Sequence, residues 1–293
     1  MATGTRAQPS RVEGPTVWEA ADHADPSGWT VALDGGDLAA LAGEDGALAE
    51  RPLVGRLKAA LDGGPGFLVV EGMPVHDEER AIELLLRLGA ALGPIVPQTK
   101  DGAPFSRVQA ETGGRVRGAR TTRALLYHSD FAGSVPDAIG LLAVRAAKEG
   151  GESLVVSGHT VHDVLLERDP ESLARLYEPF CFDRSGYVEG EDQPVLEAPV
   201  FERDGDRVLT LYNRARLHRG HLVTRRPLDE RALRALDAFD AVLAEERYVL
   251  RFTLAPGSML FTNNRVIVHN RTAYADHDDP SRKRLLIRMW MGA

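Results

Sequence analysis

The stretch MLFTNNRVIVH, residues 259–269, contains two short apolar runs, Met259–Phe261 and Val266–Val268, separated by a polar turn. Runs of this length that are bounded by turn residues are typical of buried strands. Similar runs recur after residue 94 at Ile139–Val144, Ser153–Val156, Arg207–Tyr212, Tyr248–Leu254 and Leu285–Trp290. Because helices do not alternate with these runs, the pattern favours a mainly β sandwich or jelly roll with attached helices over a doubly wound parallel sheet.

Helical periodicity is confined to a few segments. Asp77–Leu92 carries apolar residues at helical spacing, has acidic residues in its first turn and ends at Gly93-Pro94. Two further helices are predicted over Val161–Tyr177, with an interruption at Pro170, and over Leu228–Glu246. A buried strand is predicted just before the first helix, at Gly66–Val70.

The length of 293 residues permits one large domain or two small ones. Residues 1–28 are polar and rich in turn residues, so we expect a mobile N-terminal arm, anchored by a single contact at Trp18 or Trp29. Residues 29–293 are expected to form a single domain with a jelly-roll core, outer helices and lid loops. The lid is expected at Ser185–Pro194, where glycines flank acidic residues.

Composition and charge exclude several classes of protein. Hydrophobic residues make up 43% and charged residues 27% of the chain, which is the balance of a globular protein. A net charge of −8 gives no overall attraction to phosphate backbones or anionic lipids, so neither nucleic acid nor membrane is expected as a partner. The single cysteine, Cys181, cannot form an internal disulfide, and residues 1–15 lack the apolar run of a signal peptide, so a cytoplasmic location is expected.

Histidine and aspartate are the best candidates for chemistry. In ALLYHSDF, residues 124–131, an extended chain would place His128 and Asp130 on one face, about 7 Å apart. A third ligand could come from another strand at His269, which ends an apolar run. Two histidines and one carboxylate on one side of a metal ion leave open positions, as in non-haem Fe(II) oxygenases. The alternative is that these residues are ordinary polar groups of the core or its rim.

The C-terminal run RLLIRMW, residues 284–290, adds a second feature. In a strand, Arg284, Leu286 and Arg288 would share a face. If that face is the interior of the barrel, each guanidinium needs an anion, and a carboxylate is the natural partner. The alternative is an edge strand in which arginine limits aggregation, or ion pairs within the protein.

These motifs, in this order, resemble the TauD/TfdA family of Fe(II)- and 2-oxoglutarate-dependent dioxygenases, which includes proteins similar to clavaminate synthase. The resemblance rests on YHSD at 127–130, GGES at 150–153, NNR at 263–265, HNRT at 269–272 and the run 284–290. It implies a double-stranded β-helix, that is, a jelly roll or cupin-like barrel, with helices packed outside. It also implies Fe(II), 2-oxoglutarate and O2 as cofactor and cosubstrates.

The resemblance also implies roles for individual residues. His128, Asp130 and His269 match the iron ligands of the family. Arg284 matches the arginine that binds the distal carboxylate of 2-oxoglutarate, with Arg282 as the fallback, and Ser153 matches a residue that assists it. Arg288 matches a position that binds an acidic group of the substrate in several members.

Two more arginines are candidates for the substrate site. Arg214 follows the end of a predicted strand, where an ordinary hydrogen-bonding role is the alternative. Arg123 belongs to a basic loop just before the YHSD motif, and a solvated loop is the alternative there. The histidine pairs His159 with His162 and His218 with His221 are expected to be solvated surface groups.

The predicted function is therefore a dioxygenase that hydroxylates an unactivated C–H bond of a small anionic or amino-acid-like metabolite, with succinate and CO2 as coproducts. A zinc-type hydrolase that uses the same three ligands is one alternative. A jelly-roll binding module without catalytic activity is another.

Overall fold

The structure, a computed structural model, describes residues 9–43, 48–98, 101–111, 118–132, 134–184 and 195–292. Its centre is a seven-stranded sheet in the order β1-β2-β13-β5-β16-β3, with β4 also paired to β16. All neighbours in it are antiparallel except the parallel pair β1 and β2. Its strands are β1 (Thr30–Ala32), β2 (Phe67–Glu71), β3 (Ile95–Val96), β4 (Phe105–Val108), β5 (Ala138–Arg145), β13 (Met259–Asn263) and β16 (Leu285–Met291).

A smaller antiparallel sheet faces the large one. It consists of β12 (Leu250–Phe252), β7 (Ser153–Ser157) and β14 (Ile267–Arg271), with β7 in the middle. Side chains from the inner faces of both sheets form one apolar core, in which Phe67 and Leu260 of the large sheet lie with Val155 and Ile267 of the small one. Two facing antiparallel sheets with a shared core form the predicted jelly roll, and the prediction of a mainly β fold with attached helices is confirmed.

The outer face of the large sheet is covered by three helices, α1 (Gly35–Ala42), α2 (Pro52–Asp62) and α3 (Glu78–Leu92). Because side chains alternate along a strand, Leu68 and Val70 point outward, into an apolar core that they share with Leu57 of α2 and Leu85 of α3. The side chain of Asp77 accepts a hydrogen bond from the backbone of Arg80 and so caps α3. The predicted helix over residues 77–92 is confirmed, whereas α1 and α2 were not predicted.

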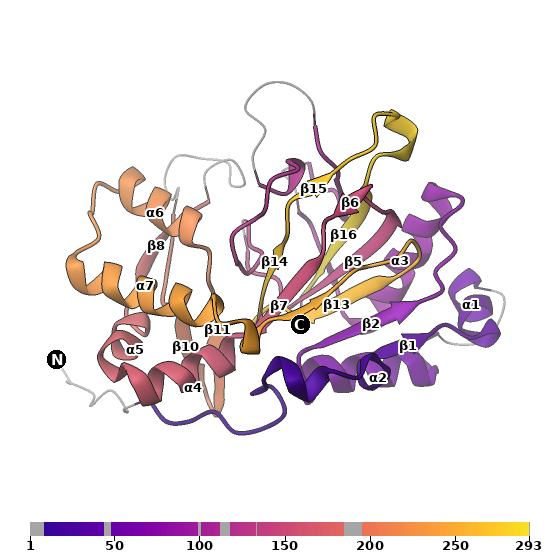
Figure 1. Ribbon diagram of the computed structural model, residues 1–293. Coiled ribbons are helices and arrows are strands. Elements are labelled where there is room, and N and C mark those ends of the chain that lie inside the picture. Colours follow the sequence, from indigo (N-terminus) through magenta and orange to yellow (C-terminus); the bar gives the residue numbers. More distant parts are fainter. Residues whose placement is uncertain are drawn as a thin grey trace.

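The outer face of the small sheet is covered by a second group of helices, which lies on the opposite side of the molecule in Figure 1. The members of this group are α4 (Gly158–Arg168), α5 (Pro170–Leu176), α6 (Arg214–Val223) and α7 (Glu230–Leu243). Asp169 separates α4 from α5 and caps α5, so the predicted interruption at Pro170 is confirmed. The short helix α6 was not predicted.

Short elements connect these layers. Three two-stranded pairs are β6 (Glu149–Gly150) with β15 (Tyr274–Ala275), β8 (Phe180–Asp183) with β9 (Val195–Ala198), and β10 (Phe201–Asp204) with β11 (Arg207–Thr210). The 3-10 helices are Ala20–His23, Pro26–Gly28, Leu48–Glu50, Gly118–Arg120, Glu246–Tyr248 and Pro280–Arg282. The lid expected at Ser185–Pro194 lies outside the described residues.

The N-terminal segment makes more contacts than the single anchor expected from the sequence. Trp18 and Trp29 are both buried, and the backbone of Trp18 exchanges hydrogen bonds of 2.9 and 2.8 Å with the hydroxyl of Thr160 in α4. The backbone N–H of Val12 donates to Asp163, at 2.9 Å. Residues 12–18 therefore pack along α4, while the predicted mobility of residues 1–28 and the boundary at residue 28 stay predictions.

The expectation that His159 and His162 are solvated is wrong. His159 is 6% exposed and His162 is fully buried. His159 contacts Thr16 and the carbonyl of Val208, while His162 contacts Asp163 and Tyr177. These polar groups are buried because each finds a hydrogen-bonding partner, which composition alone does not reveal.

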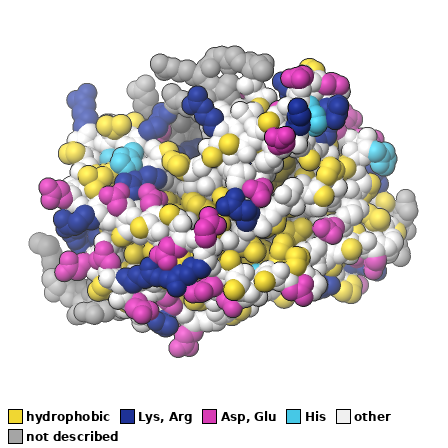
Figure 2. Space-filling view, in the orientation of Figure 1, with side chains coloured by type: hydrophobic (Ala, Val, Ile, Leu, Met, Phe, Trp, Pro, Cys, Tyr) yellow, Lys and Arg dark blue, Asp and Glu magenta, His cyan; other side chains and the backbone are white. Residues whose placement is uncertain are grey.

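Charged side chains of both signs are interspersed over the face of the molecule in Figure 2. Many of them are paired on the surface, such as Arg168 with Glu245 and Arg231 with Glu178. None of the helices in the described ranges combines the length and the apolar composition that crossing a membrane requires.

Candidate active site

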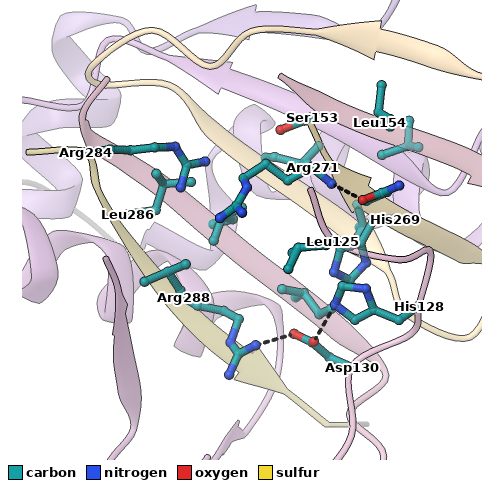
Figure 3. Close-up of a pocket in the computed structure, with 17 residues that line it drawn as sticks. Leu125, His128, Asp130, Ser153, Leu154, His269, Arg271, Arg284, Leu286 and Arg288 are labelled. Atoms are coloured by element: carbon teal, nitrogen blue, oxygen red, sulfur yellow. Dashed lines mark hydrogen bonds and ion pairs between the residues drawn. The ribbon is translucent and has the colours of Figure 1, made fainter. Parts of the chain in front are cut away.

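A cavity lies between the two sheets and contains most of the residues singled out from the sequence (Figure 3). Its walls are apolar, with Ile139 and Leu260 from the large sheet and Val155 from the small one. Two polar groups interrupt these walls. One contains His128, Asp130 and His269, with Arg288 beside Asp130, and the other contains Ser153, Arg271 and Arg284.

His128 and His269 are held together by their backbones. The N–H of each residue donates to the carbonyl of the other at 3.0 Å, which forms an isolated antiparallel bridge between the segment before residue 131 and β14. Directly opposed residues of an antiparallel pair project to the same side, and the two imidazole centroids are 4.4 Å apart. The bridge thus brings together two side chains that are far apart in the sequence.

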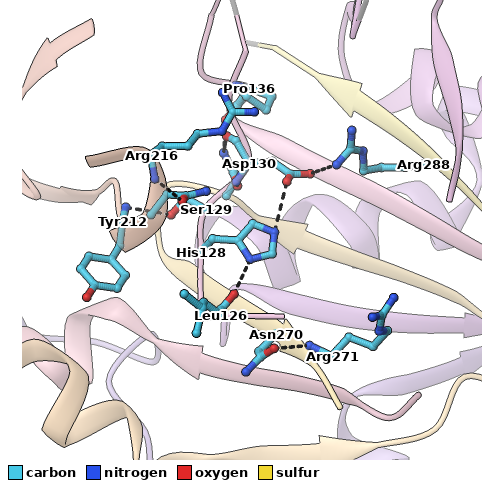
Figure 4. A network of polar contacts seen from close by, with 12 residues as sticks. Leu126, His128, Ser129, Asp130, Pro136, Tyr212, Arg216, Asn270, Arg271 and Arg288 are labelled. Atoms are coloured by element: carbon cyan, nitrogen blue, oxygen red, sulfur yellow. Dashed lines mark hydrogen bonds and ion pairs between the residues drawn. The ribbon is translucent and has the colours of Figure 1, made fainter. Parts of the chain in front are cut away.

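The ring orientation of His128 is fixed by Leu126, whose carbonyl accepts a hydrogen bond from Nδ1 at 2.7 Å. Because a carbonyl can only accept, Nδ1 carries the proton and Nε2 presents its lone pair. Nε2 lies 3.6 Å from Oδ1 of Asp130 (Figure 4). A histidine that donates from one nitrogen to a carbonyl is the common arrangement of a metal ligand.

Asp130 is anchored through its backbone by the fully buried Asn264. The side-chain oxygen of Asn264 accepts from the N–H of Asp130, and its amide nitrogen donates to the Asp130 carbonyl, both at 2.8 Å. The ligand atoms offered by His128, Asp130 and His269 all lie within 4.8 Å of one another. The structure therefore brings together the three residues that the sequence selected.

The three residues have the charge states that a metal site requires. Burial, and the neighbouring His128, lower the pKa of His269 to about 3, and burial also lowers the pKa of His128. Burial alone would raise the pKa of Asp130, but the guanidinium of Arg288 holds it well below its ordinary value. At neutral pH two uncharged imidazoles thus face one carboxylate, and Nδ1 of His269 is buried without a hydrogen-bonding partner among the described residues.

Arg284 supplies a buried positive charge at the other end of the cavity. It is 5% exposed, and its Nη1 has no hydrogen-bonding partner in the described part of the chain. The guanidinium lies 5.1 Å from the ring centroid of Tyr274, and that of Arg271 lies 4.6 Å from the same centroid. Burial, together with Arg271, lowers the pKa of Arg284 to about 10, which still leaves the group charged at neutral pH. This end of the cavity is therefore suited to an anion.

Arg284, directly before β16, and Arg288, within it, point into the cavity as predicted. Arg284, Leu286 and Arg288 all line it, which confirms that they share a face. The alternative of an edge strand is wrong, because β16 is paired with β5 on one side and with β3 and β4 on the other. Arg288 donates from Nη1 to Oδ2 of Asp130 at 3.0 Å.

Three other arginines do not line the cavity. Arg214 donates to Asp237 and Asp240 of α7 and to His218, so its guanidinium is held against that helix. Arg123 is exposed, and its carbonyl accepts a hydrogen bond from Arg271. Arg282, the fallback for Arg284, is also exposed. Of the arginines proposed for binding, the structure places only Arg284 and Arg288 in the cavity.

Four residues of the site were given no role from the sequence, namely Gln98, Asn264, Arg271 and Trp290, although the last three lie in motifs that carry the family resemblance. The position of Trp290 could have been predicted from the sequence. Side chains two positions apart in a strand lie on the same face, and Trp290 lies two positions after Arg288. Gln98 lies in the loop between β3 and β4, where no sequence motif indicates a role in the site.

Comparison with known proteins identifies related families. Residues 37–290 match the model of a family described as taurine catabolism dioxygenase TauD, TfdA family. The chain is 30% identical to uridine-5'-phosphate dioxygenase from an Amycolatopsis species, over 76% of this chain and 83% of the relative. It is 28% identical to FR-33289 synthase from Streptomyces rubellomurinus, over 96% of this chain and 90% of that protein.

Solved structures share the fold. Asparagine oxygenase in complex with Fe(II), 2S,3S-3-hydroxyasparagine and succinate superposes with a TM-score of 0.69 at 23% identity, over 90% of this chain and 93% of the other. The non-heme iron oxygenase OrfP in complex with Fe and alpha-ketoglutaric acid superposes with a TM-score of 0.64 at 18% identity, over 90% and 94% of the two chains. The arrangement of strands around the cavity is thus one that iron oxygenases use.

Proposed function

Because the chain belongs to the TauD/TfdA family, and is thus an Fe(II)- and 2-oxoglutarate-dependent dioxygenase, we propose that His128, Asp130 and His269 hold its iron. The observation that carries this assignment is the convergence of their ligand atoms to within 4.8 Å of one another at the cavity. The chemistry of the donor set fits the ion, since two neutral imidazoles and one carboxylate leave open positions on it. Bound iron, with 2-oxoglutarate and O2, supplies the oxidation of an unactivated C–H bond, and succinate and CO2 are released.

Arg284 and Ser153 are proposed to bind the distal carboxylate of 2-oxoglutarate. Both line the cavity, and both are almost completely buried. A carboxylate would supply the partner that Nη1 of Arg284 lacks among the described residues. The charge-assisted hydrogen bond would fix one end of the diacid and direct its other end toward the histidines. The apolar walls between the two polar groups would exclude water from the path.

The substrate is proposed to be a small polar metabolite that carries an anionic or amino-acid group, and hydroxylation is the proposed outcome. Arg288 supports this proposal, because its side chain lines the cavity and its Nη2 has no partner among the residues that the structure describes. The names of similar proteins support this substrate class, since they refer to uridine-5'-phosphate and to hydroxylated asparagine and arginine. A cytoplasmic location is also proposed, on the ground that the chain has a single cysteine.

The test is the formation of succinate from 2-oxoglutarate under Fe(II) and O2, with candidate amino acids and nucleoside monophosphates as substrates. We expect turnover that depends on O2 and rises with the correct substrate. A double variant, His128→Ala with Asp130→Ala, should lose this turnover, whereas Arg107→Met, which removes a surface ion pair with Glu78, should keep it. Full turnover by the double variant would remove the proposed ligand assignment.

A further inference from the structure

The two oxygens of the Asp130 carboxylate have different surroundings (Figure 4). Oδ1 faces Nε2 of His128 at 3.6 Å. Oδ2 accepts two hydrogen bonds, from Nη1 of Arg288 at 3.0 Å and from Nε1 of Trp290 at 2.9 Å. Both donors come from β16, two positions apart on one face of the strand. One oxygen is therefore engaged by the protein, and the other is directed at the histidines.

The two donors are themselves held in place. Trp290 is 2% exposed and packs with Ile139 and Ala132. The guanidinium of Arg288 lies 4.8 Å from the Trp290 ring centroid, and its Nε donates to Oε1 of Gln98 at 2.9 Å. Gln98 is 2% exposed and donates back to the carbonyl of Arg288 at 2.8 Å. Neither donor can rotate away from the carboxylate without breaking contacts of its own.

The backbone of Asp130 is fixed by a separate pair of hydrogen bonds. Asn264 binds both the N–H and the carbonyl of Asp130, from the turn between β13 and β14. With its backbone held from one side and Oδ2 from another, the carboxylate has little freedom to turn. The orientation of Oδ1 is thus imposed by the protein.

On the premise of the proposed function, we propose that Arg288 and Trp290 are positioning residues that make Asp130 bind the metal through Oδ1 alone. Carboxylates bind divalent ions through one oxygen or through both. If Oδ2 were also bound, the protein would supply four donor atoms, and a chelating 2-oxoglutarate would fill the remaining positions of an octahedral ion. By engaging Oδ2, the two residues keep one position available for O2.

This inference gives Arg288 a role that differs from substrate binding. Its Nη1 and Nε are committed to Asp130 and Gln98, so the contact with the metal ligand exists without any substrate. Loss of a hydrogen bond to a metal ligand from a neighbouring side chain commonly lowers metal affinity or activity by about tenfold to a hundredfold. A substrate-binding role alone would leave the substrate-free metal centre unchanged.

The experiment compares nitric oxide binding, as a stand-in for O2, in substrate-free protein loaded anaerobically with Fe(II) and saturating 2-oxoglutarate. The variants are Trp290→Phe, Arg288→Met and Arg288→Lys, and the yield of the iron–nitrosyl species is measured by electron paramagnetic resonance. The matched control is Trp18→Phe, which removes a buried indole donor whose partner is the Pro65 carbonyl, remote from the cavity. The visible absorption band of the iron–2-oxoglutarate chelate reports that each protein is loaded.

We expect Trp290→Phe and Arg288→Met to form the chelate but to lose nitrosyl yield by on the order of tenfold. Arg288→Lys, which keeps the charge, should lose less, and Trp18→Phe should match wild type. Variants that load fully and give the wild-type nitrosyl yield overturn this inference and leave the proposed function intact. A wild-type protein that forms no chelate overturns the proposed function, and this inference with it. Arg288 is partly exposed, so its variants keep the test valid if Trp290→Phe fails to fold.

Discussion

Substitution of Arg284 by methionine is expected to weaken the binding of 2-oxoglutarate without lowering the stability of the fold. The guanidinium is 5% exposed and forms no ion pair with any described residue, so its charge is compensated in part by the Tyr274 ring and by the more distant carboxylate of Asp276. Burial of a single charge costs several kcal/mol of desolvation free energy, and an apolar side chain of similar size does not incur this cost. The lost contact with Tyr274 offsets about 0.5 to 2 kcal/mol of this. We therefore expect the free energy of unfolding without ligands to be unchanged or higher.

Binding of 2-oxoglutarate should weaken in the same variant. A hydrogen bond to a charged group contributes roughly 1.5 to 3 kcal/mol, which corresponds to roughly a tenfold to 150-fold loss in affinity. A cosubstrate concentration of a hundred times the wild-type Kd stabilises the wild type by about 2.7 kcal/mol. If the Kd rises about a hundredfold, the same concentration stabilises the variant by only about 0.4 kcal/mol.

The assay is thermal unfolding with manganese(II) in place of iron, with and without 2-oxoglutarate, and isothermal titration gives the Kd directly. For a domain of this size, about 2.7 kcal/mol raises Tm by roughly 4 to 5 °C, and the variant should show a rise of less than about 1 °C. Arg107→Met, from the surface of β4, should respond as wild type does. An Arg284→Met protein that is destabilised without ligand, and that still shows the full rise in Tm, would refute the reasoning.

Three further predictions concern stability. The pKa of His269 is lowered from 6.5 to about 3 in the folded protein. Between these two pH values the unfolded chain binds a proton at this residue and the folded protein does not. The free energy of unfolding of the metal-free protein therefore falls as the pH falls through this window. His269→Asn should flatten this dependence in urea unfolding measured from pH 7 to pH 4, and an unchanged slope would contradict it. Asn264→Ala removes both hydrogen bonds to the Asp130 backbone and should lower the free energy of unfolding by about 2 to 4 kcal/mol, where a loss below about 1 kcal/mol would argue against the anchoring role. Trp18→Ala should cost about 3 to 5 kcal/mol in denaturant unfolding because the indole is 4% exposed, whereas a freely moving arm would give less than about 0.5 kcal/mol.

The parts of the site that follow from local periodicity could be predicted from the sequence. A repeat of two places His128 beside Asp130, and Arg284 on the face of Arg288, before any tertiary contact is known. The pairing of His128 with His269 came from residue type and from the family resemblance, since the residues between them carry no local signal. The backbone bridge that joins them is a tertiary feature.

The features that could not be predicted from the sequence depend on contacts between residues that are not neighbours in the chain. The assignment of Arg288 to the substrate rests on the family resemblance, and its contacts with Asp130 and Gln98 were not predicted because nothing near Arg288 in the sequence indicates them. Arg214 was placed near the pocket because it follows the end of a predicted strand, although α7 binds its guanidinium. His162 looked like a surface group because its burial depends on Tyr177, fifteen residues away, and on Asp163. The short helices α1 and α6 carry too few turns for periodicity to identify them. In α2, by contrast, the buried residues Leu53, Leu57 and Leu61 do recur at helical spacing, and this signal was missed.

The position of β16 in the chain has a consequence for biosynthesis. This strand is the last in sequence order and inserts between β5 and β3. It carries Arg288 and Trp290, and Arg284 lies directly before it. A nascent polypeptide on the ribosome can expose the two histidines and Asp130 before these residues have been translated. Until then the sheet has an open gap and the carboxylate lacks its two donors, so the centre matures only after translation has passed residue 290. A metal ion that bound the two histidines and Asp130 during synthesis would therefore bind before Arg284, Arg288 and Trp290 complete the site.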